Sequence, residues 1–161
     1  MATWYLALRW IHILSATAWF GEVVTINFVL VPAVSALPKD QAPRVLFQIF
    51  PRIFKLASWL SATAVLSGLG LASKRYLANP EVLWTTGSGI LFSIGATMGI
   101  LLAGFHFILE PRLDGMICTA AKEEDAELSD RVMHLLKVIP RVGLVVISTV
   151  LWTMMVGARG L

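Results

Sequence analysis

Four apolar stretches, each long enough to cross a bilayer, dominate this sequence of 161 residues. A membrane-spanning helix needs roughly 20 predominantly apolar residues. The apolar stretches predict helices at about 4–34, 42–76, 82–109 and 131–155, and a short polar segment outside the membrane at about 119–130. Only 14% of the residues are charged, whereas soluble domains have about 25%. We therefore predict an all-α fold, an integral membrane four-helix up-down bundle that forms a single transmembrane domain over residues 1–161.

Basic residues gather on one side of the predicted bundle. We call the side that holds the N-terminus side A and the opposite side side B. The side-B residues are Lys39, Arg44, Arg52, Lys55, Arg112, Lys122, Arg131, Lys137 and Arg141, and the side-A residues are Arg9, Lys74, Arg75 and Arg159. Because cytoplasmic loops carry an excess of Lys and Arg, we predict a multi-pass protein of the inner or plasma membrane with side B in the cytoplasm and both termini outside.

Three histidines are candidate ligands. His12 lies about two turns into the first predicted helix, and a neutral imidazole held by a partner through one nitrogen can bind haem iron or another metal through the other. A histidine that hydrogen-bonds across the bundle is the alternative, and the residue alone does not decide between them. His106 is near the side-B end of the third helix, roughly 20 Å from His12 along the membrane normal, too far for both to ligate one haem. His134 opens the fourth helix, where a lone histidine is usually an amphipathic edge.

Glu22 lies deep in the first predicted helix. A carboxylate at that depth is either protonated or paired. Arg52, Lys55 and Arg141 enter from side B at comparable depth and within reach of such a group. Three interpretations stay open: a structural ion pair between helices, a proton route, and an anchor for the propionates of a cofactor.

Other polar and small residues bear on which cofactors and partners the protein has. The methionines are dispersed, whereas copper sites favour clustered thiols and thioethers. Glycines in the second and third helices suit close helix approach in lipid, and they could equally leave a slot for a flat macrocycle. No basic run with interleaved aromatic residues indicates a nucleic-acid partner. The expected partner is the lipid bilayer, and neither a homo-oligomer nor a larger membrane complex is excluded.

Several short motifs follow one another in a familiar order. They are RWIHIL at 9–14 with WFG at 19–21, FPRIFK at 50–55 leading to SGL at 67–69, GFH at 104–106 and VIP at 138–140. This order resembles the four helices of HemJ-type protoporphyrinogen oxidases and of the wider CopD-like copper-resistance membrane domains. The likeness covers nearly the whole chain, although each motif alone is loose.

The resemblance implies a haem b site. In HemJ-type proteins the first-helix histidine is associated with haem b, and a third-helix lysine is its expected partner. Carried over, His12 would be the ligand, with Trp19 of the WFG motif also at the cofactor. The matching third-helix position falls near Gly95, and that span has no lysine, so Met98, one turn away, is the substitute ligand we consider. Candidates for contacts with the haem carboxylates are Arg52, Lys55 and Arg141.

Three functions follow from these observations. The first is a haem b-binding membrane redox protein that passes electrons to quinone, with oxidation of protoporphyrinogen IX to protoporphyrin IX if the resemblance extends to activity. The second is a CopD-like copper transport or resistance protein, with copper at His12 or His106 and Met98 as a helper. The third is an accessory subunit whose intramembrane polar residues only join helices.

Overall fold

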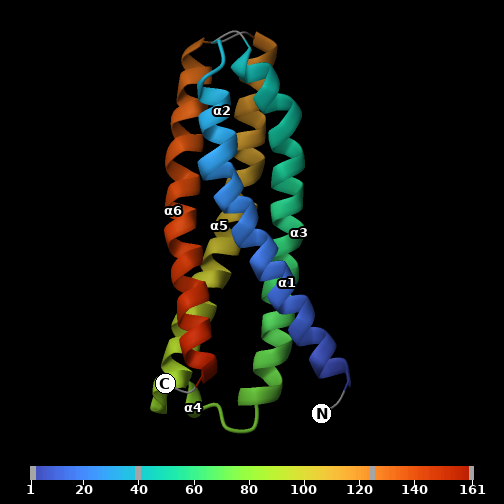
Figure 1. The fold of residues 1–161 in the computed structure, drawn as a ribbon, viewed down its shortest axis with the longest axis vertical. Helices are drawn as coiled ribbons and strands as arrows, with labels where there is room; N and C mark the ends of the chain where they lie inside the picture. The colour runs from blue at the N-terminus through green and yellow to red at the C-terminus, as the bar shows by residue number, and fades with distance from the viewer. Residues whose placement is uncertain (1–2, 39–40, 124–125, 160–161) are drawn as a thin grey trace.

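The computed structural model describes residues 3–38, 41–123 and 126–159. This part of the chain has four long helical segments and no strand (Figure 1). The first combines α1 (Thr3–Thr25), a π-helical segment η1 (Ile26–Leu30) and α2 (Val31–Ser35). The second is α3 (Ala42–Tyr76), the third is α5 (Gly87–Glu123) after the short α4 (Val82–Thr85), and the fourth is α6 (Ala126–Arg159). The predicted all-α, up-down four-helix bundle is confirmed.

The ends of the third and fourth helices differ from the prediction. The second predicted helix, 42–76, agrees with α3, but the predicted end of the third helix at residue 109 is wrong, because α5 continues through Pro111 to Glu123. Proline removes one backbone donor, a loss that membrane helices tolerate where neighbours satisfy the freed carbonyl. The predicted polar segment at 119–130 is therefore not a separate element. Its described residues form the end of α5 and the first turns of α6.

A break at Thr86 separates α4 from α5. The backbone of Thr86 is extended, with φ −119° and ψ 147°, and its Oγ1 accepts a hydrogen bond from the backbone nitrogen of Gly89 at 3.1 Å. A threonine side chain that accepts from the third helical N–H is a standard N-cap. The long helix predicted to begin at residue 82 therefore begins at Gly87.

Each of the four long helices has the length and composition to cross a membrane. Only 11–22% of the most apolar stretch of each helix is buried inside the protein, so most of its apolar surface faces outward, towards lipid. The helices contain 33–35 residues, which corresponds to roughly 50 Å. Because the hydrocarbon core of a bilayer is only about 30 Å thick, the bundle protrudes from the membrane.

The protruding part is at side B. Near side A, the ammonium of Lys74 lies 4.6 Å from the ring centroids of both Trp4 and Tyr5, a combination typical of the membrane interface. About 20 residues of helical rise above that level span the hydrocarbon core. This count ends near residue 24 of α1 and residue 54 of α3, where the exposed Lys55 lies.

The buried core residues form two clusters, one in the protruding part and one in the membrane part. The larger cluster lies towards side B and consists of Ile26, Val31, Val34, Leu46, Phe50, Phe54, Leu113, Ile117, Val132 and Leu136. The smaller cluster lies within the membrane part and consists of Trp19, Ala103 and Ile147. Between them, the Asn27 amide in η1 donates hydrogen bonds to the carbonyls of Pro140 and Val23, both at 2.8 Å. Asn27 thus joins the first helix to α6.

Helix neighbours determine which side chains can meet. α1 packs on α3, α3 on α5 and α5 on α6, so α1 and α5 lie across the diagonal of the bundle (Figure 1). On α3 the buried positions of the membrane part are small: Ala57, Ser61, Ala64 and Ser67. Small residues let helix backbones approach closely in lipid, so α3 is the central support for both of its neighbours.

Candidate functional site

Four polar side chains from three helices meet inside the membrane part, close to side B. They are Glu22 of α1, Ser58 of α3, and His106 and Glu110 of α5, and we call them the carboxyl–histidine cluster. By the helical rise from Lys74, the cluster lies about one turn inside the side-B boundary of the hydrocarbon. Ionisable groups at such depth are costly and usually mark a pathway or a relay.

Glu110 is the centre of this cluster. Ser58 Oγ donates a hydrogen bond to Oε2 of Glu110, and His106 Nε2 lies 3.5 Å from the same oxygen. His106 and Glu110 are four residues apart on α5, which places them on one face of the helix. The backbone of Phe54, one turn before Ser58, lies near the His106 ring, so two neighbouring turns of α3 face both side chains.

Glu22 faces this centre without a hydrogen bond. Both of its carboxyl oxygens are buried and have no hydrogen-bond partner among the described residues. The charge of Glu110 acts on this carboxyl. The ion pair with Arg52, Lys55 or Arg141, one of the three interpretations of Glu22, is not found among the described residues, and all three cations are exposed. Glu22 and Glu110 therefore share a low-dielectric site, where ionising both is costly.

His12 forms a second, separate polar contact. Its Nδ1 donates to the carbonyl of Ala64 at 2.8 Å, with Ser67 Oγ at 3.4 Å, and its ring packs against Gly68. His12 thus contacts α3 at residues 64–68, whereas His106 lies near Phe54 and its partner Glu110 contacts Ser58. Ten residues of helix correspond to about 15 Å, so the two histidines belong to different sites, as the sequence predicts.

The other predicted site residues are not part of either contact. Trp19 is buried and packs with Ala103 and Ile147, which makes it a core residue here. Met98 is half-buried on α5, and His134 is exposed on α6. Arg52 lies at the surface beside Asp114 and Cys118, where a shallow pocket opens.

The residues present do not form the two-ligand haem slot that the resemblance implies. His12 faces α3, whereas Gly95 faces α6, where an added Cβ would lie 2.5 Å from Thr153 Oγ1. Gly68 and Gly70 are likewise covered, by His12 and Leu8. The glycines that could leave a slot are therefore filled by neighbouring side chains, and His12 and the position of the expected second ligand lie in different helix seams.

A metal centre is not evident either. Within residues 3–38, 41–123 and 126–159, no group of three or more His, Cys, Asp or Glu side chains is arranged to hold a metal ion. Glu22, Glu110 and His106 interact, but they do not form such a group.

Sequence reasoning missed two members of the cluster. The third helix predicted from the sequence ends at about residue 109, so Glu110 falls just outside it, and Ser58 is not among the predicted site residues. The signal that points to Glu110 is its spacing of four residues from His106 within one continuous helix. Ser58 carries no such signal, since a serine in a membrane helix more often bonds its own backbone.

The fold and the site together define an integral membrane four-helix bundle with an intramembrane carboxyl–histidine cluster. The family model described as a domain of unknown function, DUF4149, matches residues 14–122. Since this match covers more than half of the chain, the protein belongs to the DUF4149 family. The matched region includes all four residues of the cluster. No curated protein and no solved structure matches the chain.

Proposed function

We propose that this protein transfers protons within the membrane, with Glu22, His106 and Glu110 as the exchanging groups and Ser58 as a positioning residue. The observation that supports this most directly is the buried Glu22 carboxyl, which lies near a second carboxyl and has no hydrogen-bond partner among the described residues. A structural carboxyl is normally satisfied by a cation or by donors, because an unpaired one destabilises the fold. A group that must gain and lose a proton keeps its oxygens available.

Polar groups along α3 extend the cluster towards side A. Ser58 contacts Glu110, and Ser67 lies beside His12 nine residues further along, a rise of about 14 Å. Ser61, between them, is completely buried. These hydroxyls and His12 supply groups that donate and accept protons at successive depths, so the proposed route runs along the face of α3 that holds both contacts.

Proton flux into vesicles tests this function. The wild type, reconstituted in liposomes that contain a pH-sensitive dye, is expected to acidify the lumen faster than protein-free liposomes when a potassium gradient and valinomycin drive protons inward. Glu110→Gln removes the central exchanging group, and a positioned acid–base group contributes about 100-fold or more to a transfer rate. We therefore expect the variant to fall to the protein-free rate.

The matched control is Glu127→Gln. Glu127 has a side chain that is 79% exposed and pairs only with Arg131 on the same helix, so its replacement is expected to leave the flux within about twofold, as for surface changes generally. Wild-type flux equal to that of empty liposomes, or an unchanged flux in Glu110→Gln, would contradict the proposal.

We also propose an orientation in the membrane. Because basic residues are in excess at side B, we place that side in the cytoplasm.

Haem b redox chemistry, with quinone as acceptor and protoporphyrinogen IX as a possible reductant, is a second candidate. One observation favours it: the hydrogen bond from Nδ1 to Ala64 leaves the lone pair of His12 on Nε2, the arrangement found in haem and metal ligands. This candidate predicts a Soret band and sharp reduced bands in the purified protein, lost in His12→Ala. A wild-type protein that is colourless and shows no haem absorption bands after reconstitution with haem would contradict this candidate. Copper has no comparable observation in its favour.

A further inference from the structure

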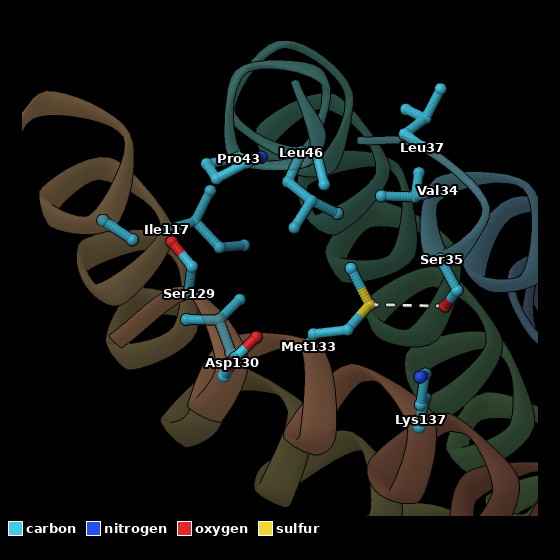
Figure 2. A pocket seen from close by; sticks show the side chains of 13 residues that line it. Val34, Ser35, Leu37, Pro43, Leu46, Ile117, Ser129, Asp130, Met133 and Lys137 are labelled. Atoms are coloured by element: carbon cyan, nitrogen blue, oxygen red, sulfur yellow. Dashed lines mark hydrogen bonds between the residues drawn. The ribbon is translucent and has the colours of Figure 1, made fainter. Parts of the chain in front are cut away.

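A cavity at the side-B end of the bundle is separate from the carboxyl–histidine cluster. It has a volume of about 210 Å³ and lies where the end of α2, the start of α3, the last turns of α5 and the start of α6 meet (Figure 2). Its wall is mostly apolar, with Val34, Leu46, Ile117 and Val132 from four different segments. None of these side chains takes part in the proposed proton route.

A lysine ammonium stands at this cavity. Lys137 lines the cavity and is half-buried, and no hydrogen bond or ion pair joins its ammonium to any other described residue. In Figure 2 the ammonium end of Lys137 points towards Ser35 and Met133, on the cavity side of α6. A half-buried ammonium without a partner favours an anion next to it, because desolvation of the charge is otherwise uncompensated.

We propose that this cavity binds a short amphipathic monocarboxylate, with its carboxylate at Lys137 and its chain against the apolar wall. Size sets the chain length: a cavity of about 150 Å³ is known to hold benzene, so this one holds roughly six carbons. Charge sets the head group, since Lys137 is the one cation among the described residues of the wall. A single ammonium matches the single charge of a carboxylate.

The position of the cavity agrees with such a ligand. Lys137 lies near the side-B boundary of the hydrocarbon, and Leu46 and Ile117 belong to the part of the bundle that protrudes beyond it. The ligand therefore enters from the side-B solution, with its chain in the protruding part and its carboxylate at the level of Lys137.

Methionine methyl resonances provide a local readout. Met133 lines the cavity, where its sulfur accepts a hydrogen bond from Ser35 at 3.5 Å (Figure 2), whereas Met98, Met154 and Met155 lie outside it. The protein is labelled at the methionine methyl groups, placed in nanodiscs of neutral lipid and titrated with hexanoate. We expect a saturable shift of the Met133 resonance and none at the three distant methionines.

Two variants and two further ligands make the test decisive. Lys137→Gln is expected to weaken hexanoate binding about tenfold or more, the usual consequence of losing a hydrogen bond to a charged group. Arg131 is an exposed cation on the same helix and pairs with Glu127. The control variant Arg131→Gln is therefore expected to bind hexanoate with unchanged affinity. 1-Hexanol, with the same chain and no charge, is expected to bind about tenfold or more weakly.

Three results would overturn the assignment. The first is a Met133 resonance that does not respond to hexanoate. The second is an equal response to hexanoate in Lys137→Gln, which would indicate simple partitioning of the chain. The third is a shift produced by anionic phospholipid in the nanodisc but not by hexanoate, which would assign the cavity to a lipid phosphate instead.

Discussion

Glu22→Gln is expected to remove a pH-dependent carboxylic-acid signal from the infrared spectrum of the protein in lipid nanodiscs. Glutamine has nearly the shape of glutamic acid but cannot exchange a proton. Both oxygens of Glu22 are buried and have no hydrogen-bond partner in the part of the chain that the structure describes, so its C=O stretch is expected to stand apart from those of solvated carboxyl groups. The measurement is a difference spectrum between two pH values, recorded for the wild type and the variant.

Glu127→Gln is the control for this spectrum, because Glu127 is exposed and its loss alters only the bands of solvated carboxylates. If the titrating carboxylic-acid band were the same in Glu22→Gln as in the wild type, Glu22 would not be an exchanging group. The same experiment on Glu110→Gln shows whether the two acids titrate as a pair, in which case each substitution alters the band of the other residue.

A stability measurement separates the proton-exchanging role of Glu22 from a structural one. Glu22→Leu replaces an unsatisfied buried carboxyl with an apolar group, which is expected to raise the free energy of unfolding by about 1–3 kcal/mol. A carboxyl that joins helices through an ion pair would give the opposite sign. Thermal unfolding in one detergent, followed by circular dichroism, reports the sign directly.

Gly95→Leu is expected to destabilise the packing of α5 against α6. A Cβ at residue 95 would lie 2.5 Å from Thr153 Oγ1 and 3.2 Å from the Met154 Cε, and Thr153 is only 3% exposed. A leucine must therefore push α5 and α6 apart, and overpacking of this kind costs about 1–3 kcal/mol or more. The measurement is the midpoint of thermal unfolding in detergent.

Gly104→Leu is the matched control on the same helix. Gly104 is exposed, and an added Cβ meets no atom within 4 Å. Because leucine has the higher helix propensity, by up to about 1 kcal/mol, this variant is expected to unfold at the same temperature as the wild type or slightly above it. Equal midpoints for the two leucine variants would show that the seam between α5 and α6 yields easily at Gly95.

Much of the fold follows from the length and polarity of the helices. The bounds of α3 and the depths of His12 and His106 were predicted because helical rise converts sequence position into depth. Depth does not say which way a side chain points. Arg52 and Lys55 do lie at the predicted level, but on the outer face of the bundle, so the expected ion pair with Glu22 does not form.

The least predictable part of the site is Glu110. Pro111 reads as a helix end, and with that interpretation Glu110 lies in a loop rather than one turn from His106. Whether a proline ends or merely interrupts a helix depends on neighbours that supply or replace its missing hydrogen bond. That is tertiary information, and a single sequence does not contain it. The sequence also could not show whether the glycines leave a slot for a macrocycle, since only packing shows that Thr153 and Met154 fill the space at Gly95.

The length of the helices has a thermodynamic consequence. In the protruding side-B part, residues such as Phe50, Leu113 and Leu136 are buried away from water, and burial of this kind is driven by the hydrophobic effect with its large heat-capacity change. In the membrane part that driving force is absent, and close contact between small residues replaces it. The same helices are thus stabilised by the hydrophobic effect at one end and by close packing in lipid at the other. Urea acts on the side-B end, whereas a change of lipid or detergent acts on the other, so the two halves are expected to lose structure under different conditions.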